Sequence, residues 1–83
     1  MYFLIEYDRQ RGRLVKLVAF EVADRQIAEH DRLQLELELT KQGVHHEVVI
    51  LEALSEAALR RTHRRYFETL SELATTVSNP KSR

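Results

Sequence analysis

The sequence predicts a small α+β domain whose elements follow one another in the order ββαβα. Two apolar runs rich in aromatic and β-branched residues flank a glycine near the N-terminus. A long segment rich in leucine and glutamate follows, and a third apolar run leads into an amphipathic segment. These patterns are typical of a hairpin, a helix, a strand and a second helix. We therefore expect a three-stranded antiparallel sheet with two helices packed on one face.

The two N-terminal runs, residues 2–8 (YFLIEYD) and 14–20 (LVKLVAF), have the composition that strands prefer. Between them lies RQRGR, in which Gly12 can adopt the positive φ of a tight turn. Because only this short turn separates the two runs, they predict a β-hairpin.

The stretch LQLELEL at residues 33–39 alternates like a half-buried strand, yet we assign it to a helix over residues 24–42. No glycine, proline or β-branched residue lies between Ala28 and Leu39, and leucine, glutamine and glutamate are good helix formers. Asp24 precedes the helix at the N-cap position, and Gly43 follows it at the position of a capping glycine. These start and stop signals outweigh the alternation.

The segment VHHEVVILEA predicts a third strand centred on residues 48–51. Ser55 can then cap a second helix, which carries an apolar stripe at helical spacing. The pattern is lost from about Thr75, so we expect one domain over residues 1–76 and a mobile tail over residues 77–83. The stripe consists of Leu59, His63, Tyr66, Phe67, Leu70, Leu73, Ala74 and Val77.

The order of the strands follows from their composition. The first run is the most continuously apolar of the three, as expected for a central strand. We therefore expect the order 2-1-3 with antiparallel neighbours. The alternative places the third strand beside the second and parallel to it, with a right-handed crossover through the first helix.

Composition limits the classes of function. The chain has 83 residues, no cysteine, and equal numbers of basic and acidic residues, 13 of each. This balance gives the whole molecule no field that attracts nucleic acid or anionic lipid, and the lack of cysteine excludes disulfides and thiolate metal sites. No run approaches the roughly 20 apolar residues of a membrane span, and the N-terminal apolar run is too short for a signal peptide. We expect a soluble cytoplasmic protein.

The four leucines of LQLELEL predict self-association. Residues two apart in a helix point about 200° apart, so these leucines form two stripes. One stripe can cover the sheet, which leaves Leu35 and Leu39, with Ala28, pointing away from it. The sheet is also apolar on both faces, and Tyr2 and Leu4 lie on the face that the helices leave open. Because small domains often gain stability by oligomerising, we predict a homodimer through one of these surfaces. The alternative is a monomer in which the leucines are partly exposed.

The segment LRRTHRRYF places a ridge of arginines on the solvent side of the second helix. Such a ridge can bind the phosphates of a nucleic acid, or another anionic partner such as a protein. Glu56 and Glu68 lie four residues from two of these arginines and can pair with them, so the alternative is an ordinary solvated face. The ridge consists of Arg60, Arg61, Arg64 and Arg65.

His63 lies on the apolar face of the second helix and could act as a base if a partner and a cavity adjoin it. Tyr66 and Glu6 are the residues that we expect around such a pocket. A lone histidine at this position is more often an edge-of-core residue with a single hydrogen bond. The adjacent His45 and His46 point to opposite faces of a strand, so we expect no metal site within one chain.

The sequence contains no glycine-rich phosphate loop, nucleophile elbow or catalytic triad. We therefore expect no cofactor and no catalytic residue, and the sequence favours a non-catalytic, homodimeric protein-interaction module. Binding of nucleic acid or another polyanion by the arginine ridge is the alternative. Small-molecule binding or catalysis near His63 is a second alternative.

Overall fold

The computed structural model describes residues 1–68. The three strands form one antiparallel sheet in the order β2-β1-β3, so the α+β class and the predicted strand order are confirmed. No helix in this part of the chain is long and apolar enough to cross a membrane. The elements are β1 (Tyr2–Asp8), β2 (Arg13–Phe20), a 3₁₀ turn (Val22–Asp24), α1 (Arg25–Gln42), β3 (Glu47–Glu52), α2 (Glu56–Thr62) and a second 3₁₀ turn (Arg64–Tyr66).

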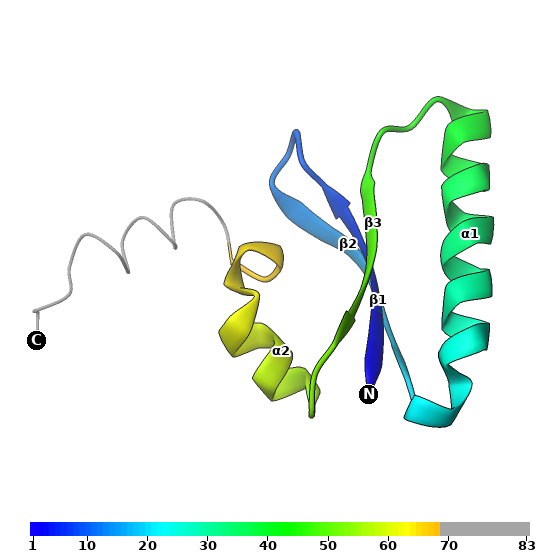
Figure 1. Ribbon diagram of the computed structural model, residues 1–83. Coiled ribbons are helices and arrows are strands. Elements are labelled where there is room, and N and C mark those ends of the chain that lie inside the picture. Colours follow the sequence, from blue (N-terminus) through cyan, green and yellow to red (C-terminus); the bar gives the residue numbers. More distant parts are fainter. Residues whose placement is uncertain (69–83) are drawn as a thin grey trace, which may run out of the picture.

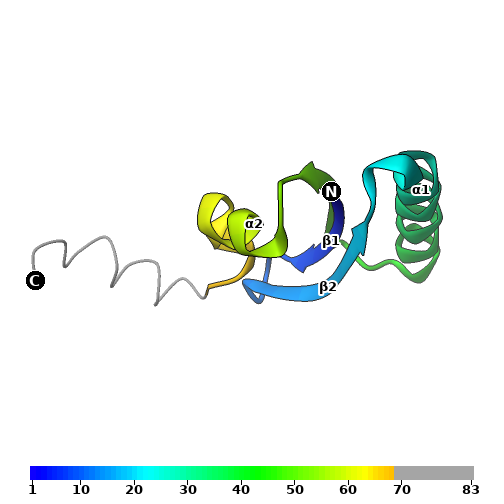
Figure 2. The ribbon, with the colours of Figure 1, turned by 90° about the horizontal axis from the view of Figure 1, so that it is seen from below.

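The two helices lie on opposite faces of the sheet, with the strands between them (Figures 1 and 2). The prediction that both helices pack on one face is therefore wrong. Side chains alternate along β1, so Phe3 and Ile5 pack against Leu59 of α2, whereas Leu4 lies on the side of α1. All three β1 residues are buried. Both apolar faces of β1 are thus covered inside one chain, by one helix on each face.

The ends of α1 follow the predicted signals. The LQLELEL stretch is helical, as predicted. Gly43 closes the helix in the left-handed conformation (φ 72°), and its N–H donates to the carbonyls of Leu39 and Thr40. Asp24 occupies the N-cap position, but its side chain accepts no capping hydrogen bond.

The stripe of α1 that covers the sheet is the opposite of the predicted one. Ala28 and Leu39 are buried and Leu35 is half-buried, because this side of the helix faces the strands. Leu33 and Leu37 point outward and are 49% and 52% exposed. The expectation that Leu35 and Leu39 point away from the sheet is therefore wrong.

The second helix is shorter than predicted. The Ser55 hydroxyl accepts a hydrogen bond from the N–H of Ala58 (3.1 Å), which confirms the predicted cap. The helix ends at Thr62, because His63 (φ −124°, ψ 55°) leaves the helical conformation. The predicted stripe residues beyond Phe67 and the predicted tail, namely Leu70, Leu73, Ala74, Val77 and residues 77–83, lie outside the described residues.

The single helix on the α1 face does not cover all three strands. Strands are spaced about 4.8 Å apart and a helix is about 10 Å wide, so one helix covers about two strands. Helix α1 contacts β3 and β1. Strand β2 is left bare on this face, where Val18 remains exposed.

Candidate functional site

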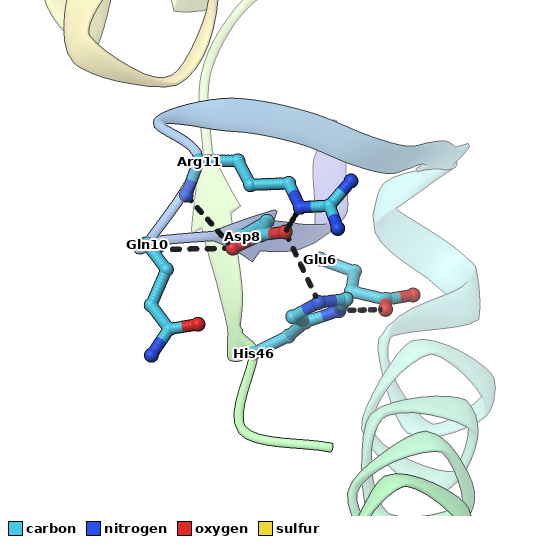
Figure 3. Close-up of polar contacts among 5 residues, drawn as sticks. All are labelled: Glu6, Asp8, Gln10, Arg11 and His46. Carbon is cyan, nitrogen blue, oxygen red and sulfur yellow. Dashed lines mark hydrogen bonds and ion pairs between the residues drawn. The ribbon is translucent and has the colours of Figure 1, made fainter.

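A histidine between two carboxylates joins β3 to β1 on the α1 face (Figure 3). Glu6 pairs with Val48 in the sheet register, so His46, two residues earlier, reaches the same face beside Asp8. The Nδ1 atom of His46 lies 2.6 Å from Oε2 of Glu6, and its Nε2 atom lies 3.6 Å from Oδ2 of Asp8. Glu6 is only 6% exposed. We name Glu6, Asp8 and His46 the His46 cluster.

Asp8 also shapes the β1–β2 turn. Its Oδ1 atom accepts the N–H groups of Gln10 and Arg11, both at 3.1 Å (Figure 3). The hydrogen bond from the Arg11 N–H is the main cause that lowers the pKa of Asp8, and burial opposes it. His46 and the Arg11 guanidinium, 3.7 Å away, lower the pKa further. Asp8 is therefore an anion at neutral pH.

The geometry of the His46 cluster suits anchoring rather than catalysis. Both ring nitrogens of His46 face carboxylates, so neither is directed at an open position where a substrate could bind. The contact with Glu6 lies within hydrogen-bond distance, whereas the 3.6 Å contact with Asp8 is longer than a hydrogen bond. Among residues 1–68, no group of three or more possible ligands could hold a metal ion. The cluster holds the segment after α1 against β1 and so fixes the start of β3.

A second polar cluster fixes β3 on the α2 face. The Tyr66 hydroxyl donates to Oε2 of Glu47 (2.6 Å), and the Arg65 guanidinium donates to the same oxygen (2.7 Å). The Tyr66 ring meets the Tyr7 ring edge-on at 5.2 Å. We name Tyr7, Glu47, Arg65 and Tyr66 the Glu47 cluster. The adjacent residues His46 and Glu47 thus anchor the same strand on opposite faces.

The Glu47 cluster shifts two pKa values in opposite directions. Burial raises the pKa of Glu47, but hydrogen bonds from Tyr66 and Arg65 outweigh it and lower the pKa overall. Burial also raises the pKa of Tyr66, and the hydrogen bond to Glu47 raises it further. The stable form of the cluster is a Glu47 carboxylate that accepts a hydrogen bond from the hydroxyl of a neutral Tyr66.

The predicted pocket around His63 does not assemble. Glu6 lies on the α1 face within the His46 cluster, whereas His63 and Tyr66 lie on the other face. The rings of His63 and Tyr66 are 6.5 Å apart, but the hydroxyl of Tyr66 is directed at Glu47. The described residues therefore place no acid beside His63.

The predicted arginine ridge is divided, because the helix that should carry it ends at Thr62. Three of its four arginines form ion pairs with glutamate side chains. Arg60 pairs with Glu56 at 2.8 Å, Arg64 with Glu68 at 2.7 Å, and Arg65 with Glu47 at 2.7 Å. Arg61 makes no ion pair with the residues that the structure describes. This pattern resembles a solvated face more than a phosphate site.

The predicted open sheet face is covered. Leu4 is buried on the α1 face, and Tyr2 is half-buried with the Arg25 guanidinium 5.6 Å above its ring. Leu4 is therefore not available to a partner as predicted, and Tyr2 is only partly accessible. Within residues 1–68, exposed large apolar side chains occur on β2, along α1 and the turn before it, and in the segment after β3. They are Val15, Val18, Val22, Ile27, Leu33, Leu37 and Leu54.

The outer edge of β3 carries unpaired backbone groups. Met1 and Ala53 exchange two hydrogen bonds (3.0 and 3.1 Å), which fixes the alternation along the β1–β3 ladder. The N–H and C=O groups of Val49 and Leu51 then point to β1. Those of Val48 and Ile50 point outward, where no other strand formed by residues 1–68 pairs with them. The sequence did not reveal this edge, because which backbone groups point outward depends on the register of β3 against β1.

Comparison of the chain with protein-family models, curated proteins and solved structures finds no match.

Proposed function

We propose that this chain is a soluble, cytoplasmic, non-catalytic protein-interaction module that works as a homodimer. The observation that carries the proposal is the outer edge of β3. It presents the apolar run VVIL between Glu47 and Glu52, in regular register with β1 and with no lysine, proline or bulge. Natural sheets usually protect an open edge with one of these devices. A strand that lacks all of them is suited to pair with another strand.

The two polar clusters favour a role in binding over a role in chemistry. Within the His46 cluster and within the Glu47 cluster, the polar side chains bind one another. Both clusters hold the start of β3 in place. A strand fixed in this way loses little conformational freedom when a partner pairs with it. The clusters thus support a rigid docking edge.

The test is the mass of the protein in solution, measured by light scattering over a concentration series. The proposal predicts a mass near twice that of the 9.8 kDa chain, falling toward the chain mass only on dilution. A mass of one chain at all concentrations, up to the limit of solubility, would contradict the homodimer.

Polyanion binding through the arginine ridge stays the second proposal, with weaker support because Arg60, Arg64 and Arg65 are already paired with acids. It predicts binding to a single-stranded oligonucleotide that weakens steeply with salt and is lost when Arg60 and Arg61 are replaced by glutamate. Absence of binding at low salt would eliminate it.

A further inference from the structure

We infer that two copies join along β3 about a two-fold axis, and that their α1 helices pack side by side through a self-complementary row of charges. The joined sheet has six strands, with the two β3 strands antiparallel at its centre. This inference rests on the proposed homodimer and adds its geometry. The charge row of α1 consists of Arg25, Glu29, Arg32 and Glu36.

The position of α1 over the sheet favours joining along β3. Helix α1 lies over β3 and β1, so its axis is about half a strand spacing inside β3. Pairing of two β3 strands about 4.8 Å apart then sets the two α1 axes about 10 Å apart. Packed helices are 8–10 Å apart, so the two helices come into contact.

Joining along β2 would not bring the helices together. The same arithmetic places the two α1 axes about 19 Å apart, because both β2 strands would then lie between them. A gap of this width leaves the bare face of β2 uncovered, with Val18 exposed in both copies. Strand β2 also carries Lys16 at its edge and a bulge where its register with β1 shifts, and both features hinder pairing.

The charge row lies on the flank of α1 that overhangs β3. Arg25, Glu29 and Arg32 line a groove together with Val48 and Ile50. Glu36 continues the row and lines the adjoining groove, also beside Val48. Within the helix, Arg25 pairs with Glu29 and Arg32 pairs with Glu36, both at 3.0 Å. The side chains are between 37% and 64% exposed, so a second copy can add contacts to these pairs.

The order of charges along the row fits an antiparallel copy of itself. The row reads plus, minus, plus, minus from its N-terminal end. Reversed by a two-fold axis, it presents minus, plus, minus, plus, so Arg25 meets Glu36 of the second copy, and Arg32 meets Glu29 of the second copy. A parallel copy would oppose like charges. The row therefore selects the antiparallel orientation that the β3 pairing also requires.

One axis can serve both the row and the strand. Arg25 lies at the Glu52 end of β3, since it stacks on Tyr2, the sheet partner of Glu52. From there to Glu36 the helix rises about 16 Å, and β3 from Glu52 to Glu47 is also about 16 Å long. The centre of the row is thus level with the centre of the strand.

The pairing also keeps the acidic ends of β3 apart. The residues of β3 whose backbone groups point outward pair with the same set in the second copy, so the two-fold axis passes through a residue and not between two residues. When the two strands are centred on each other, that residue is Val49 or Ile50. Glu52 then lies opposite His46 or Val48 of the second copy, and never opposite Glu47. The strand can pair with itself without bringing two carboxylates together.

The test uses two charge-reversal variants that should form dimers only with each other. Glu29→Arg with Glu36→Arg makes the row wholly positive, and Arg25→Glu with Arg32→Glu makes it wholly negative. Each alone should have a Kd for self-association at least about tenfold above that of the unmodified chain at low salt. An equimolar mixture should regain the mass of a dimer in light scattering, and native mass spectrometry should identify it as the mixed species.

The matched control is Asp31→Arg with Glu38→Arg. These residues lie on the other flank of α1, beside Lys16 and Val18, and their reversal changes the net charge by the same amount as Glu29→Arg with Glu36→Arg. The control should dimerise like the unmodified chain. Circular dichroism verifies that each variant is folded. If a double variant does not fold, the single changes Glu29→Arg and Arg32→Glu repeat the test at one contact.

The outcomes separate the two proposals. A dimer that neither charge variant weakens would place the interface elsewhere and overturn the inference, while the homodimer would stand. Weakening in the control as in the variants would also overturn it, because the cause would then be net charge. A monomeric unmodified chain would overturn the homodimer itself.

Discussion

Strands β2 and β3 flank the same central strand, run in the same direction and form the two open edges of the sheet, yet they differ in every feature that governs pairing. Strand β2 has a bulge, exposes Lys16 and Val18, and lacks a helix above it on one face. Strand β3 keeps a regular register, presents an uncharged run and lies under α1.

The difference shows how a small sheet can protect one edge and offer the other. On β2 the bulge and the lysine are protective devices. On β3 two polar clusters at His46 and Glu47 fix the strand but leave its outer backbone groups free. We expect changes in β3 to have larger effects than equivalent changes in β2, and the following experiments test that expectation.

The largest effect is expected at the His46 cluster. His46→Ala removes the partner of the buried Glu6 carboxylate, and we expect a loss of about 2–3 kcal/mol in the free energy of unfolding. The cost is below that of a fully buried pair because His46 is partly exposed. Urea unfolding at pH 7 measures it. His45→Ala, at the exposed neighbour, should cost less than about 0.5 kcal/mol. Equal effects of the two changes would remove His46 from its anchoring role.

The next effect contrasts the two edges directly. Val48→Pro removes an outward N–H of β3, and Ala19→Pro removes an outward N–H of β2, so neither breaks a hydrogen bond to β1. We expect Val48→Pro to raise the Kd of the homodimer about 100-fold, or about 2.7 kcal/mol. Ala19→Pro should change it by less than about threefold. Sedimentation velocity over a dilution series distinguishes them, and a reversed order of effects would move the interface to β2.

A smaller effect is expected from pH at the Glu47 cluster. The lowered pKa of Glu47 means that its carboxylate stabilises the fold fully above the unfolded pKa, and that this contribution is lost as the pH falls through the folded pKa. Glu47→Gln should lower the free energy of unfolding by about 1 kcal/mol at pH 7. Between about pH 5 and pH 3 the variant should then lose less stability than the unmodified chain does. Urea unfolding at several pH values measures both. Parallel pH profiles for the two proteins would contradict this assignment.

The smallest effect is expected at Lys16, the β2 neighbour of the same buried Glu6. Lys16→Ala should change the free energy of unfolding by less than about 0.5 kcal/mol, because the lysine is exposed and its charge is screened. Thermal unfolding beside His46→Ala gives the comparison. A loss as large as that of His46→Ala would mean that the two edges support Glu6 equally.

Much of the fold could be predicted from local signals. The hairpin glycine, the capping Ser55 and Gly43, and the apolar central strand act through backbone conformation and alternation, which neighbouring residues determine. The placement of the helices could not be predicted in this way. Both faces of β1 are apolar, and this is compatible with helices on one face and a partner on the other, or with one helix on each face.

The orientation of α1 was predicted wrongly for a related reason. Its two leucine stripes are similar in composition, so the sequence does not favour either for the sheet. The choice depends on how the chain enters the helix from β2 and leaves it toward β3, which is a long-range constraint. Leu35 and Leu39 face the strands in consequence, and Leu33 and Leu37 face outward.

The His46 cluster was within reach of the sequence. The predicted order 2-1-3 and the alternation of side chains place Glu6, Asp8 and His46 on one face once the register of β3 against β1 is known. The register is the missing quantity, because several registers would bury VVIL equally well. The Glu47 cluster was harder to predict, since it depends on where α2 ends.

Amide hydrogen exchange at the outer edges of the sheet tests the central claim most directly. In the proposed homodimer the N–H groups of Val48 and Ile50 are hydrogen-bonded to a second copy, whereas those of Leu17 and Ala19 on β2 face water. The account predicts strong protection of Val48 and Ile50 at high protein concentration, lost on dilution, and fast exchange of Leu17 and Ala19 throughout. Exchange of Val48 and Ile50 as fast as that of Leu17 and Ala19 at every concentration would contradict it.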